Sequence, residues 1–329
     1  MNKNLLAKEH VSANEEQISN KIIKILAKSL TKNYVGGEGQ RRFHAKSHGL
    51  LKAGLTVNEL LPNEYHTAIF EPGKTYDIWV RFSNGFPEKT PDTKKGIRGM
   101  AIKILNVNGP CLEKDDMGFT QDILLTNVPI LFPGKARLQP ALIKLLFGTI
   151  PQKIGGAFGI LLSFRLGRLF KFINGGIQPA SFLNIHYSSA TAYLYGADKA
   201  IKWHTIPKRP ATGKFDKNDD ADYLRKCLAA DLSTNEYEFG LHIQLQRDAI
   251  TDPIEDASIE WTGPTIEIGT IKIDKQQFDF EERRLLEKQI LFSPWYSVED
   301  HRPLGSINRI RRTIYKAMSK LRQDQNEMR

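Results

Sequence analysis

The chain has 329 residues, of which 40% are hydrophobic and 26% are charged, an ordinary globular composition that allows a sizeable core. Its two cysteines, Cys111 and Cys227, stand far apart, and no Cys/His cluster has zinc-site spacing. This pattern excludes a disulfide-rich scaffold and fits a reducing compartment. The first residues are polar, and the longest uncharged apolar run, 154–164, is too short to span a bilayer. We therefore expect a cytoplasmic protein.

The net charge is +10 and the isoelectric point is near 9.4. Such an excess can serve nucleic acid, an anionic membrane surface or an acidic ligand. Here the basic residues are spread along the whole chain and do not form a tail, which favours a solvated basic surface. We expect no nucleic-acid partner.

The N-terminal part predicts an amphipathic helix over residues 12–33. Ser12 and Glu15 have the spacing of a capping box. Apolar residues then recur at helical intervals: Ile18, Ile22, Ile25 and Leu26. Because no linker, repeat or low-complexity tract follows, we predict an N-terminal helical arm, residues 1–37, and a single domain, residues 38–329.

From residue 50 to 130 the apolar residues follow a period of two, which is typical of strands. Strand-like segments in this part are 76–82, 100–104 and 122–125. Residues 136–176 are rich in Leu, Ile and Phe and indicate helix.

A second group of strand-like segments comprises 192–195, 201–204, 239–245 and 266–273. Asp198 and Lys199 form the tip of a hairpin between the first two, and the last helix begins near Ser306. About eight strands with helices between and after them predict an α+β fold: a closed antiparallel β-barrel flanked by helices.

The C-terminal helix carries two separate faces. An apolar stripe is formed by Ile307, Ile310, Ile314, Met318 and Leu321. Arg311, Tyr315 and Arg322 lie within roughly 40° of one another around the axis, at about 100° per residue. The face suits a tyrosinate beside cations, but a basic amphipathic helix whose tyrosine simply packs explains it too.

Four motifs, taken in order, resemble the haem pocket of the catalase superfamily. They are Arg41–Lys46, Trp79–Asn84, Gly96–Lys103 and the Arg311-x-x-x-Tyr315 pair. The resemblance covers most of residues 38–322 and includes the runs 120–133, 239–246, 253–261 and 291–295. The chain is much shorter than a full catalase, and looks more like the small catalase-related haem proteins, which include peroxidases and allene oxide synthases.

The resemblance implies haem b, with His44 above the iron and Tyr315 below it as the ligand. Ser83 would hold one ring nitrogen of His44, which fixes the tautomer and frees the other nitrogen to take a proton. Arg41, Arg81 and Arg322 would bind the haem propionates, because guanidinium groups pair with carboxylates. The full set of implied haem contacts is Arg41, Phe43, Arg81, Phe132, Arg311 and Arg322.

Two positions depart from the catalase pattern. Thr120 stands where catalases place the distal Asn that helps to position peroxide, and the neighbouring Gln121 points to the opposite face of the strand. Gly96 stands where catalases have an Asp that lines the channel. These departures predict a poor catalase that acts better on organic hydroperoxides.

The stretch 154–172 is apolar and carries Arg165, Arg168 and Lys171. It can form a greasy basic entrance for a lipid hydroperoxide, or a buried helix hairpin, which we favour.

The leading prediction is a haem-dependent, catalase-like enzyme that reacts with hydrogen peroxide or organic hydroperoxides. The alternative is an isomerase or dehydratase of fatty-acid hydroperoxides, like allene oxide synthases. A third hypothesis is a non-enzymatic basic protein whose C-terminal helix contacts nucleic acid or acidic lipid. A homo-oligomer is compatible with all three.

Overall fold

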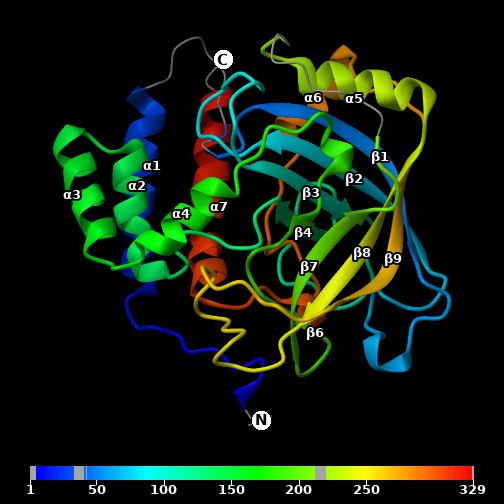
Figure 1. Cartoon of the computed structure of the whole chain (residues 1–329), viewed down its shortest axis with the longest axis horizontal. Helices are drawn as coiled ribbons and strands as arrows, with labels where there is room; N and C mark the ends of the chain where they lie inside the picture. Colours follow the sequence, from blue (N-terminus) through cyan, green and yellow to red (C-terminus); the bar gives the residue numbers. More distant parts are fainter. Residues whose placement is uncertain (1–4, 33–40, 42, 212–219, 328–329) are drawn as a thin grey trace.

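The computed structural model describes residues 5–32, 41, 43–211 and 220–327 (Figure 1). The strands are β1 (Ser47–Val57), β2 (Thr75–Asn84), β3 (Arg98–Ile104), β4 (Gln121–Thr126), β5 (Tyr187–Ser188), β6 (Tyr193–Tyr195), β7 (Lys199–Pro207), β8 (Tyr237–Leu245) and β9 (Thr265–Ile273). The α-helices are α1 (Glu15–Lys32), α2 (Gln139–Phe147), α3 (Ile150–Leu161), α4 (Leu166–Asn174), α5 (Tyr223–Thr234), α6 (Glu281–Gln289) and α7 (Ser306–Glu327).

Eight of the strands close into an antiparallel barrel. Neighbouring strands follow the order β5-β4-β3-β2-β1-β9-β8-β7, and β5 pairs with β7 to complete the ring. Strand β6 forms a hairpin with β7 beyond this ring. The predicted closed barrel of about eight strands with flanking helices is confirmed.

Side chains alternate between the core of the barrel and its outer face. On β3, Met100, Ile102 and Ile104 are buried in the main core. Because successive side chains of a strand point to opposite faces, Gly99 and Lys103 face outward. The outward-facing side chains of β2, β3 and β4 are therefore the ones that can form a site together with the helices.

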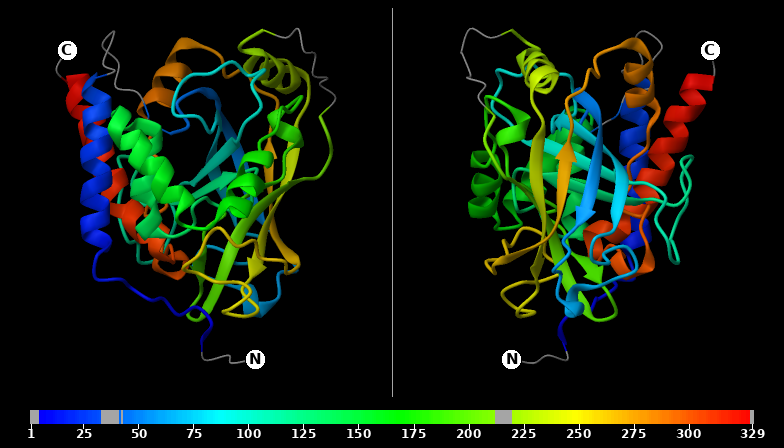
Figure 2. Two further views of the ribbon diagram at one scale, coloured as in Figure 1. Left: turned by 60° about the vertical axis from the view of Figure 1, so that its left-hand side comes forward. Right: turned by 90° about the vertical axis from the view of Figure 1, so that its right-hand side faces the viewer.

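Helix α7 lies beside α1 (Figures 1 and 2). Its apolar stripe packs with α1, because Ile310, Ile314 and Met318 join Ile18 and Ile22 in one cluster. The predicted stripe is confirmed for these residues. Burial of this stripe turns the other side of α7 away from α1.

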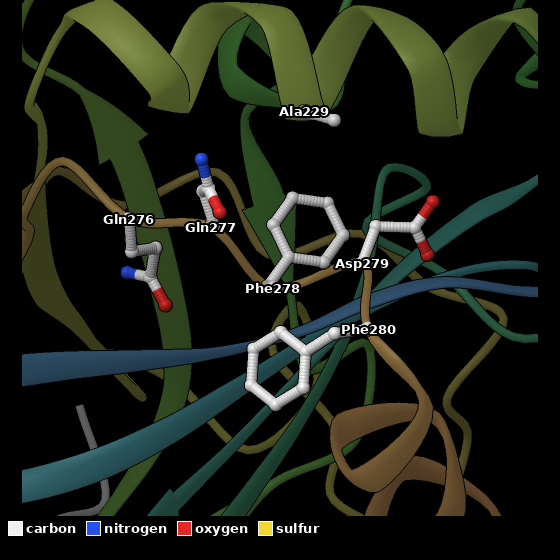
Figure 3. Close-up of a pocket in the computed structure, with 6 residues that line it drawn as sticks. All are labelled: Ala229, Gln276, Gln277, Phe278, Asp279 and Phe280. Atoms are coloured by element: carbon white, nitrogen blue, oxygen red, sulfur yellow. The ribbon is translucent and has the colours of Figure 1, made fainter.

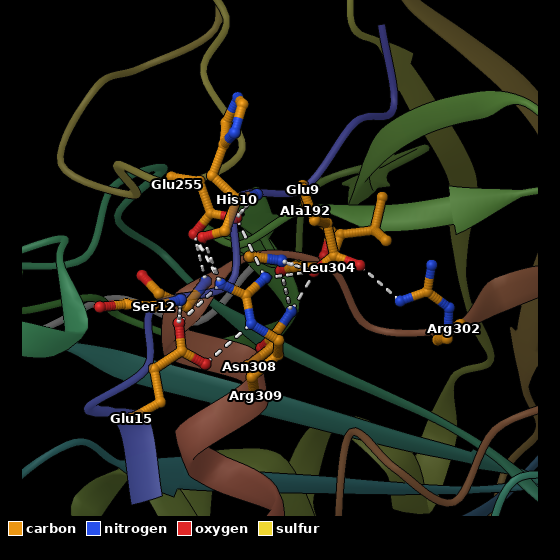
Figure 4. Close-up of polar contacts among 12 residues, drawn as sticks. Glu9, His10, Ser12, Glu15, Ala192, Glu255, Arg302, Leu304, Asn308 and Arg309 are labelled. Carbon is orange, nitrogen blue, oxygen red and sulfur yellow. Dashed lines mark hydrogen bonds and ion pairs between the residues drawn. The ribbon is translucent and has the colours of Figure 1, made fainter. Parts of the chain in front are cut away.

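Arg309, near the start of α7, anchors the N-terminal segment (Figure 4). Its guanidinium pairs with Glu9, with Glu15 at 2.8 Å and with Glu255 at 3.0 Å. The backbone N–H of Ser12 donates to Glu15 at 3.2 Å, as the capping-box spacing predicts. The predicted boundary between arm and domain, at residue 37, lies outside the described residues.

Four strands and helices were not predicted from the sequence: β1, β5, α5 and α6. The favoured prediction of a buried hairpin over 154–172 is wrong, because Ile154, Phe158 and Phe170 are exposed. In the part of the chain that the structure describes, no helix is long and apolar enough to cross a bilayer.

Candidate functional site

His44 lies in the segment that leads into β1 and is held by two residues of β2. Its Nδ1 lies 2.9 Å from Oγ of Ser83, a hydrogen-bond distance. Arg81 donates from Nη2 to the backbone carbonyl of His44 at 2.9 Å. The backbone of His44 has φ 53°, a left-handed conformation that is uncommon outside glycine. Ser83 and Arg81, both buried on β2, therefore fix an unusual backbone and one ring nitrogen.

Gly99 of β3 provides the space in which the His44 ring lies. A Cβ atom at this position would lie 2.4 Å from Cε1 and 2.5 Å from Nδ1 of His44, and 3.1 Å from Oγ of Ser83. Real Cβ atoms essentially never make contacts under 3.0 Å. The second glycine of the Gly96–Gly99 motif is therefore required by the imidazole and not by a turn.

The electrostatic surroundings keep His44 neutral. Burial lowers its pKa to about 3, and the cations Arg81, Arg311 and Arg41 lower it in the same direction. A neutral imidazole with one nitrogen at Ser83 can accept a proton on the other.

One of these cations, Arg311, belongs to α7. Arg311 of α7 acts on the pKa of His44. Burial raises the pKa of Tyr193 to about 12, and Arg311 and Tyr315 both act on that group. Arg311 also donates to Asn308 Oδ1 at 3.3 Å. Arg311 therefore lies close enough to act on both His44 and Tyr193, and Tyr315 lies close enough to act on Tyr193.

The other predicted haem contacts have different surroundings. Arg41 donates to the carbonyl of Ile290. Phe43 is exposed, and its ring meets that of Phe147 edge-on at 5.3 Å. Phe132 is buried, and its ring centroid lies 6.4 Å from that of Phe172 on α4. The side chain of Arg322 lies outside the described residues.

Thr120 does not lie beside His44, which corrects the sequence-based assignment. Thr120 is fully buried and accepts a hydrogen bond from Lys103 Nζ at 3.3 Å. The register of β3 and β4 pairs Gly99 with Thr126, six residues further on. At about 3.3 Å per residue, Thr120 is about 20 Å away along the strand. Thr126 is therefore the β4 residue beside His44, and its hydroxyl donates to the carbonyl of Val128 at 3.0 Å.

Residues 120 and 126 share a face of β4, so the alternation of side chains could not choose between them. Gln121 faces the other way, as predicted, and its Oε1 accepts hydrogen bonds from Ser297 Oγ at 3.0 Å and Val298 N at 3.1 Å. Lys103 pairs with Asp122 at 2.7 Å, and burial raises the pKa of Asp122 to about 7. Thr120 therefore belongs to the buried network around the Lys103–Asp122 ion pair, and its role is structural.

Gly96 was predicted to stand in place of a carboxylate that lines the channel. In the structure, this position has no room for a side chain. A Cβ atom there would lie 2.3 Å from the ring of Phe86. The backbone of Gly96 also pairs with Ile177, with N–H···O distances of 3.0 and 2.8 Å. The position of the carboxylate is therefore closed off by an aromatic ring.

The structure is similar to three solved catalases. A fungal catalase has a TM-score of 0.64 at 17% identity and matches 90% of this chain and 60% of its own. A bacterial catalase has a TM-score of 0.66 at 17% identity, with 96% and 62% covered. Catalase A from Saccharomyces cerevisiae has a TM-score of 0.63 at 17% identity, with 98% and 66% covered. The fold is that of catalases.

The catalase-like chain spans less than two thirds of the length of these solved catalases. No family model matches the sequence, and no curated protein matches it. The similarity therefore establishes the fold, and the chemistry has to be argued from the residues.

The residue types around His44 fit a ferric haem. His44 supplies a neutral imidazole and Tyr315 of α7 supplies a phenol, which are groups that would hold or face such an iron. Arg41, Arg81 and Arg311 supply positive charge around the imidazole, which suits a cofactor with two carboxylates. Gly99 leaves the space beside β3 in which the imidazole lies.

A separate pocket of about 170 Å³ lies between α5 and the segment that precedes α6 (Figure 3). Its lining is formed by Ala229, Gln276, Gln277, Phe278, Asp279 and Phe280. None of the described candidate residues lines it, so this pocket is distinct from the site around His44.

Proposed function

We propose that the protein is a haem-dependent, catalase-like enzyme that reacts with peroxides. The observation that carries this proposal is the buried imidazole of His44, whose Nδ1 lies 2.9 Å from Ser83 Oγ and on whose pKa Arg311, from the helix of Tyr315, acts. When bound, a ferric haem would supply the redox chemistry that cleaves the peroxide O–O bond.

His44 would act as the proton carrier. Its pKa near 3 leaves the imidazole neutral at physiological pH, so the nitrogen that does not face Ser83 can remove a proton from a peroxide oxygen. The same nitrogen can then return this proton to the departing oxygen. Ser83 keeps the tautomer constant during both transfers.

Tyr315 would bind the iron, and Arg311 lies one helical turn earlier on α7. Arg41, Arg81 and Arg322 would bind the propionates, with Phe43 and Phe132 against the haem. A guanidinium has five donors, so Arg81 can hold the carbonyl of His44 and a carboxylate together.

A second candidate is the isomerisation or dehydration of a fatty-acid hydroperoxide. Two features favour it: the ring of Phe86 against Gly96, and Thr126 in place of an amide donor beside His44. A threonine hydroxyl has one proton to donate, and that of Thr126 is used by Val128. We therefore expect weak binding of hydrogen peroxide and better use of apolar hydroperoxides.

The absorption spectrum of the purified protein tests haem binding. A Soret band and ferric charge-transfer bands would support both enzymes, whereas a colourless protein that takes up no added haem would leave only the basic, non-enzymatic binder. The kcat/KM per haem for hydrogen peroxide and for a fatty-acid hydroperoxide then separates the two reactions. Rapid oxygen evolution with a large preference for hydrogen peroxide would contradict the second candidate.

The cytoplasmic location and a homo-oligomer stay predictions.

A further inference from the structure

Helix α3 has an exposed apolar face. Ile150, Ile154, Phe158 and Leu161 recur at helical spacing, with exposed fractions of 77%, 67%, 60% and 52%. Four large apolar side chains in one exposed stripe are unusual, because most surface apolar residues stand singly.

Helix α4 and the turn before it extend this apolar face. Phe164 in the turn is 90% exposed, and Phe170 and Ile173 on α4 are 62% and 58% exposed. Helices α2, α3 and α4 lie together beside α1 and α7 (Figures 1 and 2). We call the exposed apolar residues of α3, α4 and their connecting turn the α3–α4 face: Ile150, Ile154, Phe158, Leu161, Leu162, Phe164, Leu166, Phe170 and Ile173.

The rest of the molecule holds this face outward. Gly156 turns the opposite side of α3 onto α2, where a Cβ atom would lie 2.5 Å from the carbonyl of Ala141. Arg165 and Arg168 both pair with Asp256, at 2.9 and 3.0 Å. The α3–α4 face is therefore a fixed part of the fold and not a frayed segment.

Helices α2, α3 and α4 themselves carry basic residues and no acidic ones, while Asp256 and Glu260 pair with Arg165, Arg168 and Lys171 of α4 and the turn before it. Residues 123–197 contain seven lysines and arginines and no Asp or Glu. Lys144 on α2 and Lys153 on α3 are exposed close to the apolar stripe. Apolar side chains flanked by basic ones match the surface of an anionic bilayer, which offers acyl chains below a layer of negative headgroups.

Two other occupants fit less well. A second copy would bring two basic surfaces against each other, which costs energy. Nucleic acid is recognised by basic residues that contact phosphates, whereas the large exposed side chains of the α3–α4 face are apolar.

We infer that the α3–α4 face docks on the surface of an anionic lipid bilayer, with its Ile, Leu and Phe side chains at the level of the headgroups. Amphipathic helices that lie in an interface bury their apolar side by about 5–10 Å. Docking in this way needs no membrane-spanning helix.

The face is connected to the site around His44. Phe147 of α2 meets Phe43, the neighbour of His44, at 5.3 Å between ring centroids. Beyond the end of α4, Ile177 pairs with Gly96, near the start of β3. A lipid hydroperoxide leaving the membrane would thus approach the site past α2 and the end of α4; this last step rests on the proposed function, and the docking itself does not.

Co-sedimentation of the full chain with vesicles tests the inference. We expect binding to vesicles of phosphatidylcholine with phosphatidylglycerol, weaker binding to phosphatidylcholine alone, and a decrease with added salt. Phe158→Ser with Phe170→Ser should lower the affinity about tenfold or more, because two exposed apolar anchors are lost. The matched control is Leu60→Ser with Ile250→Ser, which changes residues that are 94% and 84% exposed elsewhere.

Three outcomes would overturn the inference. One is a wild-type chain that sediments with neither kind of vesicle, and another is unchanged vesicle binding by the Phe158/Phe170 variant. The third is a wild-type dimer, seen by analytical ultracentrifugation, that this variant converts to a monomer without any effect of lipid. Vesicle binding can be measured with and without added haem, so a failure of docking and a failure of haem binding are separate results.

Discussion

A single missing carbon atom allows His44 and Gly99 to lie in contact. The His44 ring occupies the space in which a side chain at position 99 would begin, at 2.4 Å from its Cε1. Gly99→Ala should displace the imidazole from Ser83 and lower the rate with peroxide strongly. Gly54→Ala on β1 is the control, because nothing lies within 4 Å of a Cβ atom there. Equal peroxide rates for Gly99→Ala and Gly54→Ala would show that the position of the His44 ring does not matter.

His44→Ala tests the proton transfer itself. Loss of a general base typically lowers the rate by about 10²–10⁴-fold. We expect the variant to keep its haem and lose most of its peroxide reactivity, as measured by stopped-flow absorption. Ser83→Ala should have a smaller effect of the same kind, because it removes a positioning contact of 2.9 Å and not the base. A His44→Ala variant with undiminished reactivity would rule out this role.

Tyr315→Phe tests the iron ligand. Removal of the phenol oxygen should strongly lower haem occupancy and alter the ferric charge-transfer bands. The control is Tyr65→Phe, which removes a phenol outside α7. Full haem content with an unaltered spectrum in Tyr315→Phe would disprove the assignment and leave the tyrosine as a packing residue.

Arg309→Ala tests the anchoring of the N-terminal segment. The substitution leaves Glu9, Glu15 and Glu255 without their shared cation. Because breaking a largely buried pair costs about 3–5 kcal/mol, we expect a clear loss in the free energy of unfolding in urea. Arg312→Ala on the same helix breaks a pair with Glu113 that is half exposed, so its cost should be about 0–1 kcal/mol. Similar losses for both variants would contradict the anchoring role.

The buried imidazoles predict a loss of stability in acid. Burial lowers the pKa of His204 and of His301 to about 3, well below the ordinary value of 6.5. Between these values the unfolded chain binds more protons than the folded chain, so stability rises with pH and falls as the pH drops from about 6.5 towards 3. Asp122, with a raised pKa of about 7, acts in the opposite sense with one proton.

Together with His44, whose pKa is also lowered to about 3, these histidines outweigh one carboxyl, so the urea midpoint should decrease from pH 6.5 to pH 4. Each net proton contributes up to about 1.4 kcal/mol per pH unit. His301→Gln should flatten this decrease, whatever its effect at pH 7. A midpoint that increases towards acid would contradict the prediction.

Much of the fold was predictable because local pattern and global fold agree. The period of two in 76–82 and 100–104 reflects strands with one face in the barrel core, and both are present in β2 and β3. The stripe containing Ile310 and Ile314 reflects a helix with one buried side. Short-range spacing of this kind is a property of the backbone geometry alone, and the sequence carries it directly.

The contact between His44 and Ser83 was also predicted, but only by resemblance to a known pocket. Nothing in the spacing of two residues 39 positions apart requires a distance of 2.9 Å. The tertiary structure decided the third member of this group, Gly99, whose role depends on how closely the His44 segment approaches β3.

By itself, the sequence determined which residues share a face of each strand and helix, since that follows from periods of 2 and 3.6 residues. Only the tertiary structure decided the register of β4, which sets Thr126 and not Thr120 opposite Gly99. It also decided that α3 turns Gly156 inward and Phe158 outward, although an apolar helix of this composition could be buried on both sides. The register of a strand and the burial of a helix face depend on contacts between segments far apart in the chain. No local sequence pattern specifies them.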